Sequence, residues 1–184
     1  MSGGVRSPGA AWRQVAPRID PHELADLGPL EWRRPHRLRR EWVLGAGGRQ
    51  AAWLTVTGTL REQIRLEGPS GEWAIRKRWN GALELSRTGA TGPTACYAPN
   101  VWSGGVITTA SGQRYEWTRT RWWATEWAIA TSSGFQCMTF RPRRGVGRRE
   151  PVVEILASGR RLPELEVLVL LGSCLLLRAY PRAQ

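Results

Sequence analysis

The feature that most constrains the fold is a hydrophobic stretch near the end of the chain, residues 162–180, which read LPELEVLVLLGSCLLLRAY. The 11 residues 167–177 carry no charge, and apolar side chains occupy every side of a helical projection. A helix of this kind is either a membrane span or the axis of a globular core. Everything before it is rich in arginine, tryptophan and glycine.

The length of this stretch favours a core helix. A span requires about 20 mostly apolar residues, whereas runs of about 10–14 are more typical of buried helices. Glu166 and Arg178 stand at the two ends of the run, where their charges complement the helix dipole. Pro163 suits the first turn, and Gly172 with Ser173 leaves room for another element to approach. The sequence therefore predicts a buried helix near residues 163–180, with a C-terminal membrane anchor as the alternative.

A short tryptophan motif recurs upstream of this helix. Residues 41–44, 72–75 and 126–129 have the form Glu-Trp-small-aliphatic, and residues 115–118 are a looser copy. In an extended chain, the tryptophan and the aliphatic residue two positions later share a face. Glycine-bearing turns follow most copies, and a second extended run follows each turn. The pattern predicts successive β-hairpins.

Further extended segments at 60–67, 105–109, 114–120 and 152–156 bring the total to about ten to twelve strands. Residues 88–103 contain Pro93 and Pro99 and stay unassigned. Residues 1–29 are rich in proline and glycine, which predicts an irregular or disordered lead with a short helical turn at 22–27. Residues 30–184 are expected to form one domain.

The fold class that joins these elements is mainly β: an antiparallel β-barrel that encloses the hydrophobic C-terminal α-helix. A helix about 10 Å across requires more strands than a small, self-filled barrel has. A closed barrel would bury all sides of the helix and would leave no exposed sheet edges.

Several segments carry a resemblance to a known group of proteins. They are residues 40–44 (REWVL), 112–117 (GQRYEW), 122–128 (WWATEWA), 162–165 (LPEL) and 168–172 (LVLLG). Together they resemble the tubby C-terminal-like superfamily, and within it the uncharacterised bacterial members of the LURP-one-related type. The resemblance covers about residues 30–178. It implies a barrel of about twelve strands around a central helix.

The same resemblance implies a binding or scaffold module. Tubby domains bind phosphoinositide headgroups through basic surface residues, and the related phospholipid scramblases act at membranes in a calcium-dependent way. The 15 acidic residues here are scattered, and the chain has no Asp-x-Asp-x-Asp-Gly run that would predict a calcium loop. No phosphoinositide-binding residue can be transferred position by position.

The sequence offers little for catalysis or metal binding. Its two histidines, His22 and His36, lie in loop-like regions, and no serine occupies a Gly-x-Ser-x-Gly elbow. Cys96, Cys137 and Cys174 form no Cys-x-x-Cys pair, which fits a reducing, cytoplasmic compartment. The first 16 residues lack the apolar core of a signal peptide. We expect no enzymatic activity, no cofactor, no metal and no export.

Basic residues are the remaining candidates for function. The formal net charge is +12, and of the 27 basic residues only Lys77 is lysine, a skew that codon composition alone could produce. Arginine also binds phosphate groups bidentately, which predicts anionic membrane lipid or an acidic protein as partner. One cluster precedes the first tryptophan strand and comprises Arg33, Arg34, Arg37, Arg39 and Arg40. The second is the predicted anionic-ligand site and comprises Arg141, Arg143, Arg144, Arg148 and Arg149. An ordinary solvated loop is the alternative for this second cluster.

Two other functions stay open. Residues 119–123 interleave arginine with tryptophan, which could stack single-stranded nucleic acid, but most tryptophans keep the spacing of inward strand positions and are expected to pack. A protein–protein interaction module is the other alternative. The leading prediction is a non-enzymatic module for anionic phospholipid headgroups, cytoplasmic and peripheral at the membrane surface.

Overall fold

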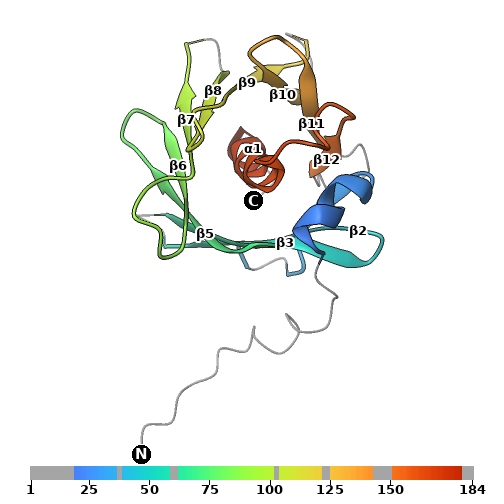
Figure 1. Cartoon of the computed structure of the whole chain (residues 1–184). Coiled ribbons are helices and arrows are strands. Elements are labelled where there is room, and N and C mark those ends of the chain that lie inside the picture. The colour runs from blue at the N-terminus through green and yellow to red at the C-terminus, as the bar shows by residue number, and fades with distance from the viewer. Residues whose placement is uncertain are drawn as a thin grey trace, which may run out of the picture.

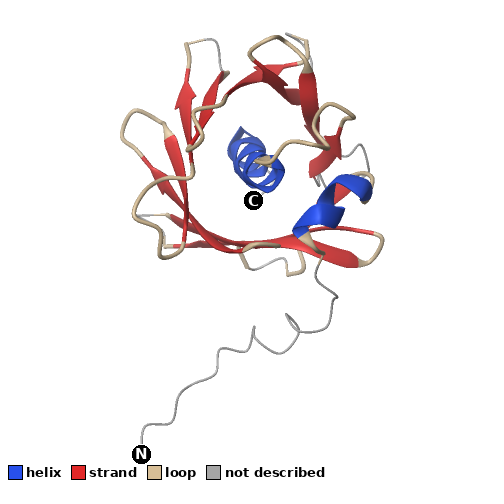
Figure 2. Ribbon diagram, viewed as in Figure 1, coloured by secondary structure: helices blue, strands red, loops and turns tan. Residues whose placement is uncertain are grey.

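Twelve antiparallel strands close into one barrel, and a helix lies inside it (Figures 1 and 2). The computed structural model describes residues 19–36, 39–58, 62–101, 104–121, 125–142 and 151–179. Each strand pairs with the next one along the chain, and β12 returns to β1 with Val153 opposite Leu30. The predicted fold class is confirmed.

The elements follow one another without crossovers. The short 3₁₀ helix η1 is Pro21–Asp26 and the central helix α1 is Leu165–Ala179. The strands are β1 Leu30–Arg33, β2 Glu41–Ala46, β3 Arg49–Thr57, β4 Gln63–Gly68, β5 Gly71–Lys77, β6 Leu83–Arg87, β7 Ala95–Pro99, β8 Gly105–Thr109, β9 Arg114–Arg119, β10 Trp127–Thr131, β11 Gln136–Pro142 and β12 Pro151–Ile155.

The three hairpins predicted from the tryptophan motifs are present as β2–β3, β5–β6 and β10–β11, and two strands were not anticipated. β1 lies where the folded domain was expected to begin, and β7 lies in the unassigned segment 88–103. Pro93 precedes β7 and Pro99 is its last residue, so neither proline interrupts the strand. β4 begins at Gln63 rather than at residue 60, which lies outside the described residues.

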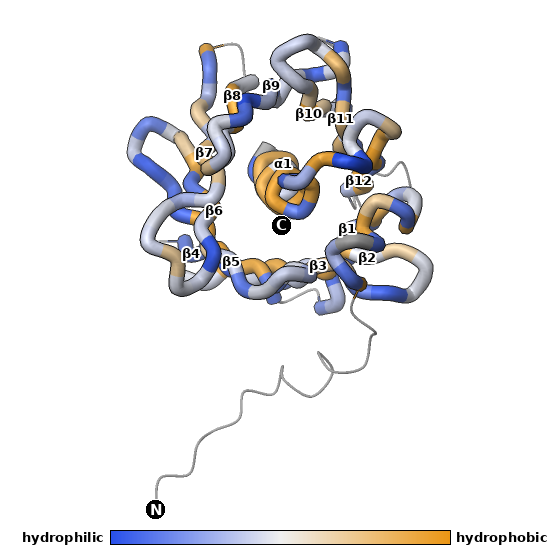
Figure 3. Tube along the Cα trace, in the orientation of Figure 1, coloured by the Kyte–Doolittle hydropathy of each residue, from blue (hydrophilic) through white to orange (hydrophobic). Residues whose placement is uncertain are grey.

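The helix is enclosed on all sides. Every residue from 167 to 177 is buried, and α1 is apolar along its length while many outer turns are hydrophilic (Figure 3). A barrel of about eight strands has room only for its own side chains, so a wider barrel is needed to admit a helix. The prediction of a core helix is therefore confirmed.

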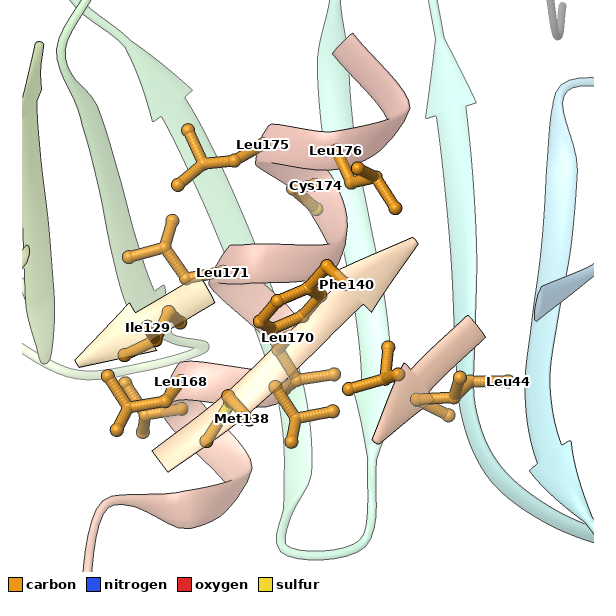
Figure 4. Close-up of a cluster of buried hydrophobic side chains, with 14 of the residues drawn as sticks. Leu44, Ile129, Met138, Phe140, Leu168, Leu170, Leu171, Cys174, Leu175 and Leu176 are labelled. Atoms are coloured by element: carbon orange, nitrogen blue, oxygen red, sulfur yellow. The ribbon is translucent and has the colours of Figure 1, made fainter. Parts of the chain in front are cut away.

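One face of α1 is notched to admit an aromatic ring. Phe140 of β11 lies against the helix at Gly172 (Figure 4), where an added Cβ would stand 2.4 Å from the Phe140 Cζ atom. The same ring meets Trp117 edge-on at 5.1 Å, and Trp117 stacks on Trp127 at 5.1 Å. The expected close approach at Gly172 is thus made by Phe140. The hydroxyl of Ser173 beside it is buried and has no hydrogen-bond partner among the described residues.

The two ends of the barrel differ. We call the end where α1 begins the entry end and the other the exit end. The N–H of Leu168 donates to the carbonyl of Glu164 at 3.0 Å, so Glu164 caps the helix, and Pro163 precedes it instead of occupying its first turn. η1 packs near the start of α1, with Leu24 and the preceding Ile19 buried in the core. Residues 19–29 thus pack with the barrel.

Two glutamates at the start of α1 bind the strands around it. Glu166 Oε1 accepts hydrogen bonds from the backbone N–H of Ser70 at 3.1 Å and from Trp73 Nε1 at 3.2 Å. Glu164 accepts one from the hydroxyl of Tyr115 at 3.2 Å. Burial, with the Glu164 charge next, raises the pKa of Tyr115 to about 12. These contacts fix the entry end of the helix to β5, β9 and the β4–β5 turn.

Candidate anion-binding groove

Strand alternation gathers basic residues at the exit end. Because neighbouring strands are antiparallel, every second connection lies at the same end of the barrel, and the exit end receives those after β1, β3, β5, β7, β9 and β11. We call the described basic residues there the basic rim: Arg33, Arg34, Arg39, Arg40, Lys77, Arg78, Arg119, Arg121, Arg141 and Arg178. Described acidic residues at this end are fewer: Glu41, Glu62, Glu84 and Glu126. The exit end therefore carries a net positive charge.

A groove of about 1120 Å³ opens on the barrel wall and reaches this rim. It runs over β4, β5 and β6, with the β6–β7 connection forming one wall and Arg178 of α1 at the rim. Its charged lining residues are Glu62, Arg65, Arg76, Lys77, Arg78, Glu84 and Arg178. The groove is thus predominantly basic.

Short side chains form the floor of the groove. Along β4 and β5 the residues between the buried ones point outward, as the alternating burial of each strand shows. Across the sheet, Ala74 is paired with Arg65 of β4 on one side and with Ser86 of β6 on the other. Because the alanine and serine are small, they leave a depression beside the long Arg65 side chain. Arg76, two residues after Ala74, faces outward from the same strand.

The acidic residues of the groove are already engaged. Glu84 accepts a hydrogen bond from Arg78 Nε at 2.9 Å, and a terminal nitrogen of the same guanidinium forms an ion pair with it at 2.7 Å. Arg40 binds Glu62 at 2.7 Å, and this hydrogen bond lowers the pKa of the Glu62 carboxyl. Within the described part of the chain, the side chains of Arg65 and Arg76 make neither a hydrogen bond nor an ion pair. Their guanidinium groups therefore remain available to an anion.

Of the site predicted from the sequence, only Arg141 is among the described residues, and it lies away from the groove. Arg141 is exposed at the end of β11, six strands away from β5 around the barrel, and its side chain lies 3.7 Å from Glu154. The structure does not bring it into the groove. The other predicted residues of that cluster, Arg143, Arg144, Arg148 and Arg149, lie outside the described residues.

Two of the arginines before β2 have local structural roles, and Arg37 of that cluster lies outside the described residues. Arg34 donates to the backbone carbonyl of Arg39 at 2.9 Å, and its guanidinium lies 5.5 Å above the ring of Trp42. Arg33 pairs with Glu31 at 3.1 Å. These side chains brace the β1–β2 connection, which leaves them less available to a ligand than Arg65 and Arg76.

Sequence reasoning missed the groove, although one signal was present. Arg76, Lys77 and Arg78 form a continuous basic run that only Trp79 separates from the Asn80-Gly81 turn. The run was not considered as a binding site because it follows a tryptophan strand motif and was assigned to a hairpin. Arg65 gave no signal, since its place beside Ala74 depends on strand register.

The described tryptophans do not form a stacking surface for bases, while Trp122 and Trp123 of the predicted arginine–tryptophan run lie outside the described residues. Trp32, Trp42, Trp53, Trp73, Trp117 and Trp127 are at most 5% exposed, and among the described tryptophans only Trp79 is exposed. Arg119 lies 5.1 Å from the ring of Trp127, but that ring is itself buried against Trp117. The prediction that most tryptophans pack is confirmed for the described ones.

The fold and the groove together define a class: a closed twelve-stranded antiparallel barrel with a central helix and a basic surface groove. Comparisons with protein-family models, with curated proteins and with solved structures give no match for this chain. In the residues that the structure describes, no cluster of histidine, cysteine, aspartate or glutamate is suited to a metal ion. Within the same residues, no helix has the length and apolar character needed to cross a membrane.

Proposed function

We propose that this protein is a non-enzymatic binding module that recognises anionic phospholipid headgroups at a membrane surface. The observation that carries the proposal is the groove on β4–β6, where Arg65 and Arg76 flank a floor of small side chains and have no partner among the described residues. Arginine binds phosphate oxygens in bidentate fashion. A phosphate ester on a lipid headgroup fits this chemistry.

The basic rim supports a membrane rather than a small soluble anion as the natural partner. Positive side chains around the exit end add a longer-range attraction to a negatively charged surface. A cytoplasmic protein peripheral at the membrane follows from this proposal. Kinship with the tubby C-terminal-like superfamily is part of it, supported by the sequence segments given above and by a barrel closed around a C-terminal helix.

The test is sedimentation with phosphatidylcholine vesicles that do or do not contain phosphatidylserine or a phosphoinositide. A surface arginine contributes about 1 kcal/mol to binding an anionic membrane. The double substitution Arg65→Ser and Arg76→Ser should therefore weaken binding roughly 30-fold. Arg114→Ser with Arg160→Ser is the matched control: both residues are exposed and lie toward the entry end, and the net charge changes equally.

Three outcomes would contradict the proposal. The wild-type protein could fail to bind anionic vesicles, or it could bind neutral vesicles as tightly as anionic ones. The two double variants could also lose affinity for anionic vesicles to the same extent. A soluble inositol phosphate serves as a second probe, since it tests the groove without a membrane. A third binding experiment uses a single-stranded oligonucleotide. If the protein binds it more tightly than it binds vesicles, and if added salt weakens this binding, the nucleic-acid alternative is favoured.

A further inference from the structure

Two large apolar side chains project from the exit end into solvent. Among the described residues, the exposed large hydrophobic side chains are Trp79 at 98%, Val101 at 91% and Phe135 at 68%. Phe135 lies at the β10–β11 turn of the entry end, whereas Trp79 and Val101 follow β5 and β7 at the exit end. Both therefore lie on the same end of the barrel as the basic rim.

The segments that carry these two residues are neighbours. The β5–β6 and β7–β8 connections flank the paired strands β6 and β7. A Cβ placed on Gly81 in the first connection would lie 3.5 Å from Pro99, which leads into the second. Trp79 and Val101 thus belong to one side of the exit end.

The turn under Trp79 is well held. The N–H of Arg78 donates to the carbonyl of Ala82 at 2.9 Å, and the N–H of Gly81 donates back to the carbonyl of Arg78 at 3.1 Å. Asn80 accepts a further bond from the N–H of Ala82 at 3.1 Å. Arg78 itself is bound to Glu84. A nearly fully exposed indole is thus presented by a hydrogen-bonded turn, and not by a frayed end.

The surroundings of Trp79 indicate what covers it. Lys77 and Arg78 directly precede it and line the groove, which also reaches Arg178. An indole beside cationic side chains matches the interface of an anionic bilayer, because tryptophan favours the headgroup level and cations favour the negative surface. Phe135, by contrast, follows the uncharged residues Ser132-Ser133-Gly134, so no basic residue directly precedes it in the chain.

We propose that Trp79, with Val101 beside it, inserts into the interfacial layer of an anionic membrane and that the barrel stands on its exit end. This inference rests on the proposed function, because the groove and the rim supply the charge that brings the membrane close. It adds an orientation: the β5–β8 side of the exit end faces the lipid, and η1 with the entry end faces away.

The test uses the full chain and phosphatidylcholine–phosphatidylserine vesicles made with brominated lipid, which quenches tryptophan at the interface. The wild-type protein should lose part of its tryptophan emission on binding, and Trp79→Ala should lose that quenching. Trp79→Ala should also bind on the order of tenfold more weakly. Phe135→Ala is the matched control, an exposed aromatic side chain at the other end, and should behave as wild type.

The two proposals fail in different ways. Equal quenching and equal affinity of the wild-type protein and Trp79→Ala on anionic vesicles would overturn the insertion while leaving the groove intact. A change in Phe135→Ala as large as that in Trp79→Ala would overturn the orientation. If neither anionic vesicles nor an inositol phosphate binds the wild-type protein, the proposed function itself is wrong. Binding of inositol phosphate by Trp79→Ala at wild-type strength shows that the variant is folded.

Discussion

The notch at Gly172 allows a quantitative prediction. In an exposed helix, replacing glycine with alanine stabilises by about 1 kcal/mol. Here the new Cβ would lie 2.4, 2.8 and 3.0 Å from three ring carbons of Phe140, far inside the usual contact distance of about 3.5–4.0 Å. The ring cannot swing away, since Phe140 is 0% exposed and packs edge-on against Trp117.

The clash should outweigh the gain in helix propensity. Overpacking a well-filled core costs about 1–3 kcal/mol, and the depth of this overlap points to the upper part of that range. Subtracting the propensity term leaves Gly172→Ala destabilised by about 2 kcal/mol, or about 4–8 °C in the melting temperature. Urea unfolding should show a lower midpoint with an unchanged slope.

Two further variants test the cause. Gly92→Ala should change the stability by less than about 0.5 kcal/mol, because no atom lies within 4 Å of the new Cβ. In a Phe140→Leu background, Gly172→Ala should cost less, with a coupling of about 0.5–3 kcal/mol between the two sites. A Gly172→Ala protein that is more stable than the wild type by about 1 kcal/mol would refute the reasoning.

Three more predictions concern α1 and its partners. Ser173→Ala should leave stability unchanged or raise it by up to about 1 kcal/mol, because the buried hydroxyl has no described partner and alanine favours helix; a clear loss in urea unfolding would argue against this. Glu166→Ala should lower the unfolding free energy by about 1–3 kcal/mol and change the fluorescence of Trp73, which loses its acceptor; unchanged values of both would contradict the assigned bond. The raised pKa of Tyr115, about 12 against an ordinary value of about 10, favours its neutral form in the fold. Its contribution to stability is thus complete below pH ~10 and disappears as the pH rises through ~12. Tyr115→Phe should flatten that alkaline decline in urea unfolding, and an identical decline in both proteins would show that another group titrates.

The barrel was predictable because its signals are local. The Glu-Trp motifs put alternate residues on one face, and turns such as Asn80-Gly81 mark the hairpins without reference to distant parts of the chain. The uncharged run 167–177 likewise required burial on every side. β7 was missed because Pro93 precedes it by two residues and Pro99 is its last residue, and from sequence alone two nearby prolines look like interruptions.

The groove depended on information that the sequence does not display. Arg65, Ala74 and Ser86 stand far apart along the chain and meet in one row only through the registers of β4, β5 and β6. Trp79 shares its residue type with the packed tryptophans, and only its position after the end of β5 leaves it in solvent. The charge runs at 33–40 and 141–149 are visible in the sequence, but charge alone does not show whether an arginine already binds a neighbour, as Arg34 binds the carbonyl of Arg39.

The order of elements along the chain also affects how the protein is made. α1 follows all twelve strands, so the ribosome synthesises every strand of the barrel before the helix that fills its interior. Until α1 is synthesised, the inward-facing leucine, tryptophan and isoleucine side chains have no core to pack into, and exposed apolar surface of this kind promotes aggregation. A chain truncated before residue 165 would therefore be degraded by proteases. It would not form a less stable version of the same fold.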